Sequence, residues 1–224
     1  MNWYRNLKIS LKLIIGFLIV AVLAGTIGIV GLISLDSIGD NAQYLYEYAT
    51  EPIRQVSRAL SLFEENRVET RNLLFIESDK ELRETIDGIR ARVDEIESIM
   101  DEYQKTIKTE TGRAYYEDFA SAYEDYLPIL NQIVDLIESG NKEAATSILF
   151  DDAMKDAAGR TQEGLQGLIS TRAKNGGLEY EKILNTSKKT KITMISLSVV
   201  GVAIAISLNQ LVNLSLRMAI KATI

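Results

Sequence analysis

Apolar residues along this chain follow two patterns, which predict two kinds of helix. Two stretches, residues 13–35 and 192–216, contain no charged residue. At about 1.5 Å per helical residue, each is long enough to cross the roughly 30 Å hydrocarbon core of a bilayer. Between them, apolar positions recur alternately three and four residues apart, which is typical of helices that pack in bundles. The pattern predicts two membrane-spanning helices flanking one helical domain.

The central domain contains three regular apolar seams and a looser fourth. The first three consist of Ile53, Val56, Leu60, Phe63, Arg67, Thr70 and Leu74; of Leu82, Ile86, Ile89, Val93, Ile96, Met100, Tyr103 and Ile107; and of Tyr116, Phe119, Tyr123, Tyr126, Leu130, Ile133 and Ile137. The fourth consists of Ile148 or Leu149, then Leu165, Leu168 and Leu178. Neither of the two clearest seams, the second and the third, fits the alternation of a strand, so the domain is predicted to be all-α.

Turn residues separate these seams. Ser78 and Glu81 have the spacing of a capping box, and residues 109–112 and 139–141 contain the glycines and cap-forming residues that end one helix and start another. The predicted helices are 36–77, 79–108, 112–138 and 142–191. Because the connections are short, these helices should form an antiparallel four-helix bundle, with the outer two continuous with the spans.

The two prolines, Pro52 and Pro128, fall inside predicted helices. A proline there removes one backbone hydrogen bond and kinks or ends the helix. Neither is flanked by turn residues, so kinks are favoured, with helix breaks as the alternative.

The charge distribution predicts the orientation of the chain. All 31 acidic residues and 20 of the 25 basic residues lie in the segment 36–191, which gives this segment a formal charge of −11, whereas the two ends carry only basic residues. Short flanks rich in Lys and Arg remain cytoplasmic. We therefore expect a cytoplasmic segment 1–12, spans 13–35 and 192–214, an extracytoplasmic domain 36–191 and a cytoplasmic tail 215–224. A cleaved signal peptide is the alternative for the first span, but its apolar core is too long.

Composition argues against several classes of chemistry. The chain has no cysteine and no histidine, so disulfides, the usual zinc and haem ligands and His-based catalytic sets are absent. Adjacent acids such as Glu64 and Glu65 diverge on a helix, and no glycine-rich phosphate loop occurs. An acidic domain also disfavours nucleic acid. We expect no enzyme, no catalytic residues, no metal and no cofactor.

Several segments, in order, resemble a known family. They are residues 3–13 (WYRNLKISLKL), 45–53 (LYEYATEPI), 67–74 (RVETRNLL), 123–126 (YEDY) and 140–145 (GNKEAA). Together they resemble the N-terminal half of bacterial methyl-accepting chemotaxis receptors with a four-helix-bundle sensor. The resemblance extends from residue 1 to about residue 208, and it depends on the ordered set because no single segment is specific.

The resemblance implies a bacterial inner or plasma membrane protein that forms a homodimer. It also implies that the ligand is a small solute, such as an amino acid or organic acid, and that the output is a shift of the last helix through the membrane. Such receptors continue into a HAMP domain and a cytoplasmic signalling hairpin, whereas residues 209–224 contain neither a proline nor an acid. We expect a receptor truncated before its output, which would reach the chemotaxis kinase complex only if a signalling domain exists.

In that family, arginines near the distal end of the bundle grip the carboxylate of a ligand at the dimer interface. The corresponding candidates are Arg67 and Arg71, one helical turn apart, with Arg160 and Thr161 in the facing stretch 150–161. The alternative is that the arginines pair inside the bundle with aspartates of that stretch, which are Asp151, Asp152 and Asp156.

Two other functions remain open from the sequence. The chain could be a membrane-anchored helical bundle that oligomerises or binds another protein and takes no small ligand. It could also be the sensor of a histidine kinase or of a cyclic-dinucleotide enzyme, because a sensor domain does not encode the output that it drives.

Overall fold

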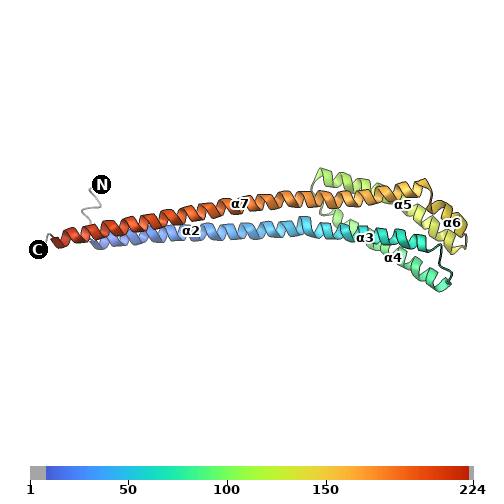
Figure 1. Cartoon of the computed structure of the whole chain (residues 1–224), viewed down its shortest axis with the longest axis horizontal. Helices are drawn as coiled ribbons and strands as arrows, with labels where there is room; N and C mark the ends of the chain where they lie inside the picture. Colours follow the sequence, from blue (N-terminus) through green and yellow to red (C-terminus); the bar gives the residue numbers. More distant parts are fainter. Residues whose placement is uncertain (1–8, 222–224) are drawn as a thin grey trace. The chain divides into compact units, whose positions relative to one another are not determined.

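The computed structural model describes residues 9–221, and every regular element within them is helical (Figure 1). The expected cytoplasmic residues 1–8 and the last three residues of the tail, 222–224, lie outside this description. The chain divides into two compact units: a bundle unit, Tyr44–Glu179, and a span unit that combines Met1–Gln43 with Tyr180–Ile224.

The bundle unit starts with a short π-helix and contains five α-helices or parts of them. The elements are η1 (Tyr46–Thr50), α3 (Glu51–Asn72), α4 (Asp79–Gln104), α5 (Glu110–Glu138), α6 (Lys142–Leu149) and the first part of α7 (Asp152–Lys221). The prediction of one helix from 142 onward is wrong, because the chain breaks between α6 and α7. There the Asp151 carboxylate accepts a hydrogen bond from the Ala153 amide at 2.8 Å, which caps the new helix.

The predicted caps are found at the other turns. The Ser78 hydroxyl accepts from the Glu81 amide at the start of α4, and the Thr109 hydroxyl accepts from the Gly112 amide at the start of α5. Gly140 takes the left-handed conformation, φ 81°, which ends α5 at little steric cost. Asn141 then caps α6.

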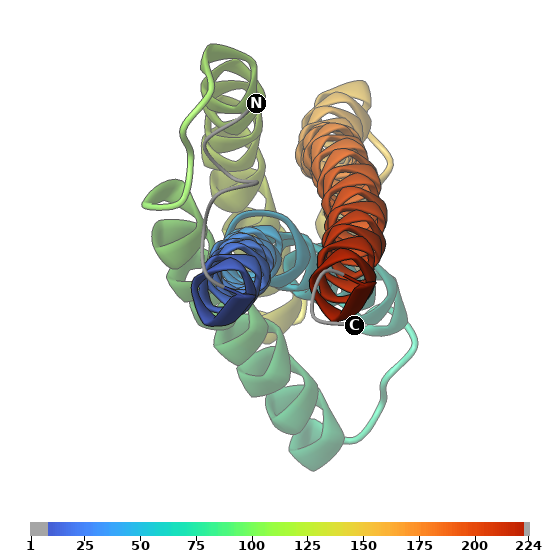
Figure 2. The ribbon, with the colours of Figure 1, turned by 90° about the vertical axis from the view of Figure 1, so that its left-hand side faces the viewer.

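Contacts between the helices define an antiparallel bundle in the order α3, α4, α5, α7. In each neighbouring pair, residue numbers rise along one helix as they fall along the other. Helices α3 and α4 meet at Arg58–Glu95 and Asn66–Ile89, and α4 and α5 meet at Arg90–Glu138 and Tyr103–Tyr116. Helices α5 and α7 meet at Asp125–Arg160 and Phe119–Gly164. Helix α7 meets α3 at Gln162–Arg67 and η1 at Gly176–Ala49. Figure 2 looks along the helices and shows α4 and α5 of this unit as separate ribbons.

The predicted seams of α4 and α5 are confirmed, since nearly all of their members are buried in one core. The α3 seam is only half right. Apart from Leu62, which is also buried, its buried positions follow the same three–four spacing, but every second one is shifted by one residue: Pro52, Val56, Ala59, Phe63, Asn66, Thr70 and Leu73. Asn66, not Arg67, therefore faces the core. The error arose because the pattern favoured the large apolar residue Leu60 over the small residue Ala59, and this shift also replaced the polar residue Asn66 by Arg67.

The seam of α7 is regular, although its sequence pattern is weak. Buried positions at the same spacing include alanine, threonine and arginine: Met154, Ala158, Thr161, Leu165, Leu168 and Arg172, with Ala157 and Gly164 buried beside them. Leu178, which was expected to continue the seam, is exposed. Leu149, and not Ile148, is the buried member of the pair in α6.

Neither proline breaks the chain into separate helices. Helix α5 runs through Pro128 without interruption, and Pro52 lies in the first turn of α3, directly after η1. The five residues of η1 form a π-helix, in which the Glu51 amide bonds to the Tyr46 carbonyl, five residues back. Pro52 thus follows a widened turn, which accommodates its ring.

The span unit pairs α2 (Ile9–Leu45) with the second part of α7, and each helix has a stretch that is apolar and long enough to cross a membrane. Large apolar side chains, such as Phe17 at 73% exposure, lie on the outside of this unit. The two helices keep one antiparallel register. Three glycines show this register. A Cβ added to Gly16 would lie 3.8 Å from Leu208, one added to Gly31 would lie 3.3 Å from Met194, and one added to Gly201 would lie 4.0 Å from Leu23. The two residue numbers of each facing pair add up to 224 or 225, so the register is the same along the whole unit.

Candidate functional site

Arg67 lies at the α3–α7 interface and is held by one acid and one amide. Its Nη1 donates to Glu64 Oε2 at 2.9 Å and to Gln162 Oε1 at 2.7 Å. The guanidinium carbon also lies 5.8 Å from the centre of the Phe63 ring. Gln162 is one residue beyond the predicted partner stretch 150–161. The predicted level of Arg67 along α7 is therefore close, but its partner is an amide and not one of the expected aspartates.

Arg160 faces α5 and not α3. Its side chain donates to Asp156 at 2.8 Å and to Asp125 at 2.9 Å, and these two hydrogen bonds raise the pKa of Arg160. Asp156 is one of the three aspartates named by the internal-pairing hypothesis. The side chain of Arg160 is 43% exposed, so solvent and salt screen both ion pairs. Within one chain, Arg67 and Arg160 therefore contact different neighbours.

The other two candidates differ in exposure. Arg71 is exposed on α3, one turn beyond Arg67. Thr161 is fully buried, and its hydroxyl donates to the Ala157 carbonyl of its own helix at 2.8 Å. The role of these four residues in ligand binding stays a prediction.

The core beside Arg67 contains unusual polar groups. The Asn66 side chain is 1% exposed and donates to the Ile89 carbonyl at 3.1 Å, while its own oxygen has no protein partner among the described residues. The hydroxyls of Tyr123 and Tyr126 are also buried without a partner in this part of the chain. Burial raises the pKa of Tyr126, and the nearby charges of Arg67 and Arg71 partly oppose that shift. These hydroxyls are neutral at physiological pH.

A surface groove of about 300 Å³ lies between α5 and α7 and includes one of the candidates. Its lining residues are Tyr115, Asp118, Ser121, Arg160, Glu163 and Gly164. Arg160 presents a cation there, and Asp118 and Glu163 present carboxylates. This combination complements a small zwitterion better than a simple anion.

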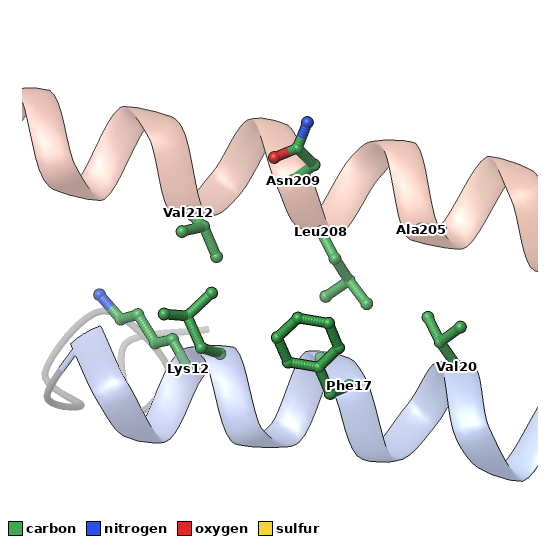
Figure 3. A pocket seen from close by; sticks show the side chains of 9 residues that line it. Lys12, Phe17, Val20, Ala205, Leu208, Asn209 and Val212 are labelled. Atoms are coloured by element: carbon green, nitrogen blue, oxygen red, sulfur yellow. The ribbon is translucent and has the colours of Figure 1, made fainter.

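A second groove lies within the span unit and has a different character (Figure 3). Its volume is about 290 Å³, and its lining is apolar except for Lys12 and Asn209. Figure 3 shows Phe17, Val20, Leu208 and Val212 turned toward the space between α2 and α7. An apolar groove between two exposed apolar helices suits hydrocarbon better than a polar solute.

Arg172, a buried arginine of α7, was not predicted from the sequence. This side chain is 9% exposed. It donates to Thr106 Oγ1 at 2.8 Å, to Tyr103 Oη at 3.1 Å and to the Tyr48 carbonyl at 3.2 Å. The signal was available, because Arg172 continues the three–four spacing of Leu165 and Leu168. A seam defined only by large apolar residues excludes it.

Comparison with known proteins identifies the family. Residues 6–187 match the family described as a four helix bundle sensory module for signal transduction. The chain belongs to this family. The matched region contains the whole bundle unit together with all of α2, so the sensory module includes Arg67, Arg160 and Arg172 alike.

A curated relative supports the same class. This four-helix-bundle sensory module is 26% identical, over 145 residues, to a provisionally named sensory transducer protein of Acetivibrio thermocellus. The aligned residues are 63% of this chain and 25% of the relative, so the chain spans about a quarter of that protein's length. The recognition of a sensory module from ordered sequence segments is therefore confirmed.

Proposed function

We propose that the chain is a chemoreceptor-type transmembrane sensor, in which the bundle detects a small solute and α7 carries the response across the membrane. The observation that supports this most directly is the family match over residues 6–187 together with α7 itself. Helix α7 is one helix of 70 residues that starts inside the sensory bundle and includes the second apolar stretch. The same helix can therefore take part in both detection and transmission.

The proposed topology places both termini in the cytoplasm and residues 36–191 outside. It is supported by the basic ends, the acidic segment between them and the two apolar helices. The membrane is proposed to be a bacterial inner or plasma membrane, and the sensor is proposed to act as a homodimer.

We propose an amino acid or organic acid as the class of ligand. Arginines hold carboxylates through two parallel hydrogen bonds, and Arg67 and Arg71 lie one turn apart on α3. The groove beside Arg160 adds two carboxylates that could hold an ammonium group. In a longer protein with a cytoplasmic signalling domain, the resulting shift of α7 would reach a chemotaxis kinase complex.

The test is a solute screen on the full chain in lipid nanodiscs, read as the melting temperature of the helical signal. An amino acid or organic acid should raise that temperature. The double variant Arg67→Gln, Arg71→Gln should abolish the rise. The matched control is Arg54→Gln, Arg58→Gln, which removes two exposed arginines of the same helix that pair with Glu51 and Glu95.

A folded dimer that shows no shift across a broad screen would contradict the sensor proposal. It would favour a membrane-anchored interaction bundle, in which the arginines serve only internal pairs. A rise that survives in the Arg67, Arg71 variant but disappears in Arg160→Gln would place the ligand in the α5–α7 groove instead.

A further inference from the structure

Tyr48 has a backbone carbonyl that an ordinary α-helix could not satisfy. In an α-helix this carbonyl would accept from the amide four residues later, but that residue is Pro52, which has no N–H. The chain responds with the π-helical turn η1, which ends two residues before Pro52. π-Helical turns are frequent at functional positions, because they interrupt the regular hydrogen-bond ladder.

Arg172 of α7 supplies a donor to this carbonyl. Its Nη1 lies 3.2 Å from the Tyr48 oxygen, while Nε and Nη2 are bound to Tyr103 at the end of α4 and to Thr106 in the following turn. The guanidinium carbon lies 5.0 Å from the centre of the Tyr103 ring. One side chain thus joins three segments of the bundle unit.

The bonding of Arg172 is unusual for a buried cation. The three oxygen atoms that accept from it are uncharged, whereas Arg67 and Arg160 both bond to carboxylates. A buried charge is costly unless its hydrogen bonds are well made, so this geometry has little freedom to relax. A flexible surface pair would tolerate displacement of one partner, but this arrangement would not.

Close backbone packing accompanies these hydrogen bonds. One turn after Arg172, a Cβ added to Gly176 would lie 2.8 Å from the Ala49 Cβ, so α7 can approach η1 this closely only with glycine there. At the neighbouring Gly177, an added Cβ would meet nothing within 4 Å. The approach is therefore specific to the face of α7 that carries Arg172.

We propose that Arg172 is a positioning residue that couples α7 to η1, so that a displacement of α7 changes the backbone geometry of the α2–α3 run. This inference deepens the proposed function, because it names the contact through which a response of α7 is passed to the other outer helix. When α7 shifts, the Arg172–Tyr48 bond either breaks or draws η1 with it. Both outcomes alter the turn that precedes Pro52.

The first experiment measures amide hydrogen exchange of residues 46–51 in the full chain in nanodiscs, with no solute. Arg172→Met should raise exchange in η1 about tenfold, because it removes a charged donor from a partly buried carbonyl. The matched control is Lys174→Met, which removes an exposed charge from the same helix and should leave η1 unchanged. Equal exchange in the two variants would overturn the proposal.

A double-mutant cycle tests whether the coupling runs through the Tyr48 carbonyl. Pro52→Ala restores an N–H that can bond to this carbonyl. In that background, Arg172→Met should change η1 exchange by less than about twofold. A tenfold effect in both backgrounds would show that Arg172 acts on η1 by general packing, and it would refute the coupling.

Tyr103→Phe provides a milder variant in case Arg172→Met does not fold. It removes only the hydroxyl that accepts from Arg172, and Tyr103 lies on α4, so its effect on η1 must pass through the arginine. We expect about threefold faster exchange in η1, and no added effect when combined with Arg172→Met. No change in η1 would count against the proposal. Because no solute is used, failure here leaves the solute-sensing proposal to be decided by its own melting screen.

Discussion

Two ends of the bundle unit each combine an arginine with a buried tyrosine, but they satisfy the arginine in opposite ways. At one end, Arg67 bonds to Glu64 and Gln162 at the edge of the core, and the nearby Tyr126 hydroxyl is buried without a protein partner among the described residues. At the other, Arg172 is inside the core and bonds to the Tyr103 hydroxyl. The first arginine bonds to one acid and one amide, which the carboxylate of a ligand could displace, whereas the second is held by neutral groups only. A bundle can thus hold an adaptable cation and a rigid one on neighbouring helices.

The largest expected effect compares a buried with an exposed arginine. Arg172→Met should lower the free energy of unfolding by about 3 kcal/mol, because it leaves one buried and two partly buried acceptors without this donor. Arg160→Met should cause no measurable change, because its ion pairs are exposed to solvent. Urea denaturation of the full chain in nanodiscs measures both. Equal losses of unfolding free energy in the two variants would contradict the distinction between a buried and an exposed arginine.

Alkaline pH should weaken the end that contains Tyr126. Burial raises the pKa of Tyr126 and Tyr123 in the folded chain above the unfolded value of about 10. The folded state therefore keeps protons that the unfolded state loses above that pH. The stabilisation is complete below about pH 10 and falls by about 1.4 kcal/mol per pH unit for each tyrosine above it. Tyr126→Phe should reduce this slope in urea titrations between pH 9 and pH 11.5, and an unchanged slope would contradict the assignment.

A pair of glycine substitutions tests the close approach at the Arg172 end. Gly176→Ala should destabilise the bundle by about 1–2 kcal/mol, because the new methyl group would overlap Ala49. Gly177→Ala should instead stabilise it by about 0.5–1 kcal/mol, since the position is helical and open. Thermal unfolding of both variants gives the comparison, and two stabilised variants would mean that α7 does not approach η1 this closely.

The smallest effect compares two hydroxyl deletions. Tyr103→Phe removes an acceptor of Arg172 and should cost about 1 kcal/mol of unfolding free energy. Tyr126→Phe removes a hydroxyl without a protein partner in the described chain, and it should leave stability unchanged or slightly raised near pH 7. If Tyr126→Phe is the more harmful change, that hydroxyl has a partner and the two ends are more alike than their geometry indicates.

Sequence periodicity predicted most of the fold because most of the core is made of large apolar residues. The seams of α4 and α5 needed nothing else. It failed where small or polar residues occupy seam positions. Asn66 was passed over in favour of Arg67, and in α7 only Leu165 and Leu168 were recognised, whereas the buried alanines and Thr161 were not. The break after α6 depended on a single capping aspartate, Asp151, which a periodic pattern does not report.

The candidate site was less predictable than the fold. The level of Arg67 along α7 followed from helix length, and its contact with Gln162 lies one residue from the predicted stretch. The partners of Arg160 depended on which face of α7 turns toward α5, and helix length does not determine this. Arg172 was missed because its structural role depends on hydrogen bonds to residues far away in the sequence, which are Tyr48, Tyr103 and Thr106.

Because the register of the span unit is constant, residue numbers can be used to measure sliding between α2 and α7. The residue numbers of the facing pairs at Gly16, Gly31 and Gly201 add up to 224 or 225. The sequence contains no cysteine, so introduced cysteines would have no competing thiol. A pair of cysteines introduced at facing positions would cross-link efficiently, and a slide of one helical turn would move the best partner by about four residues. A short series of such pairs would therefore report the direction of sliding between the two helices and its extent, counted in residues.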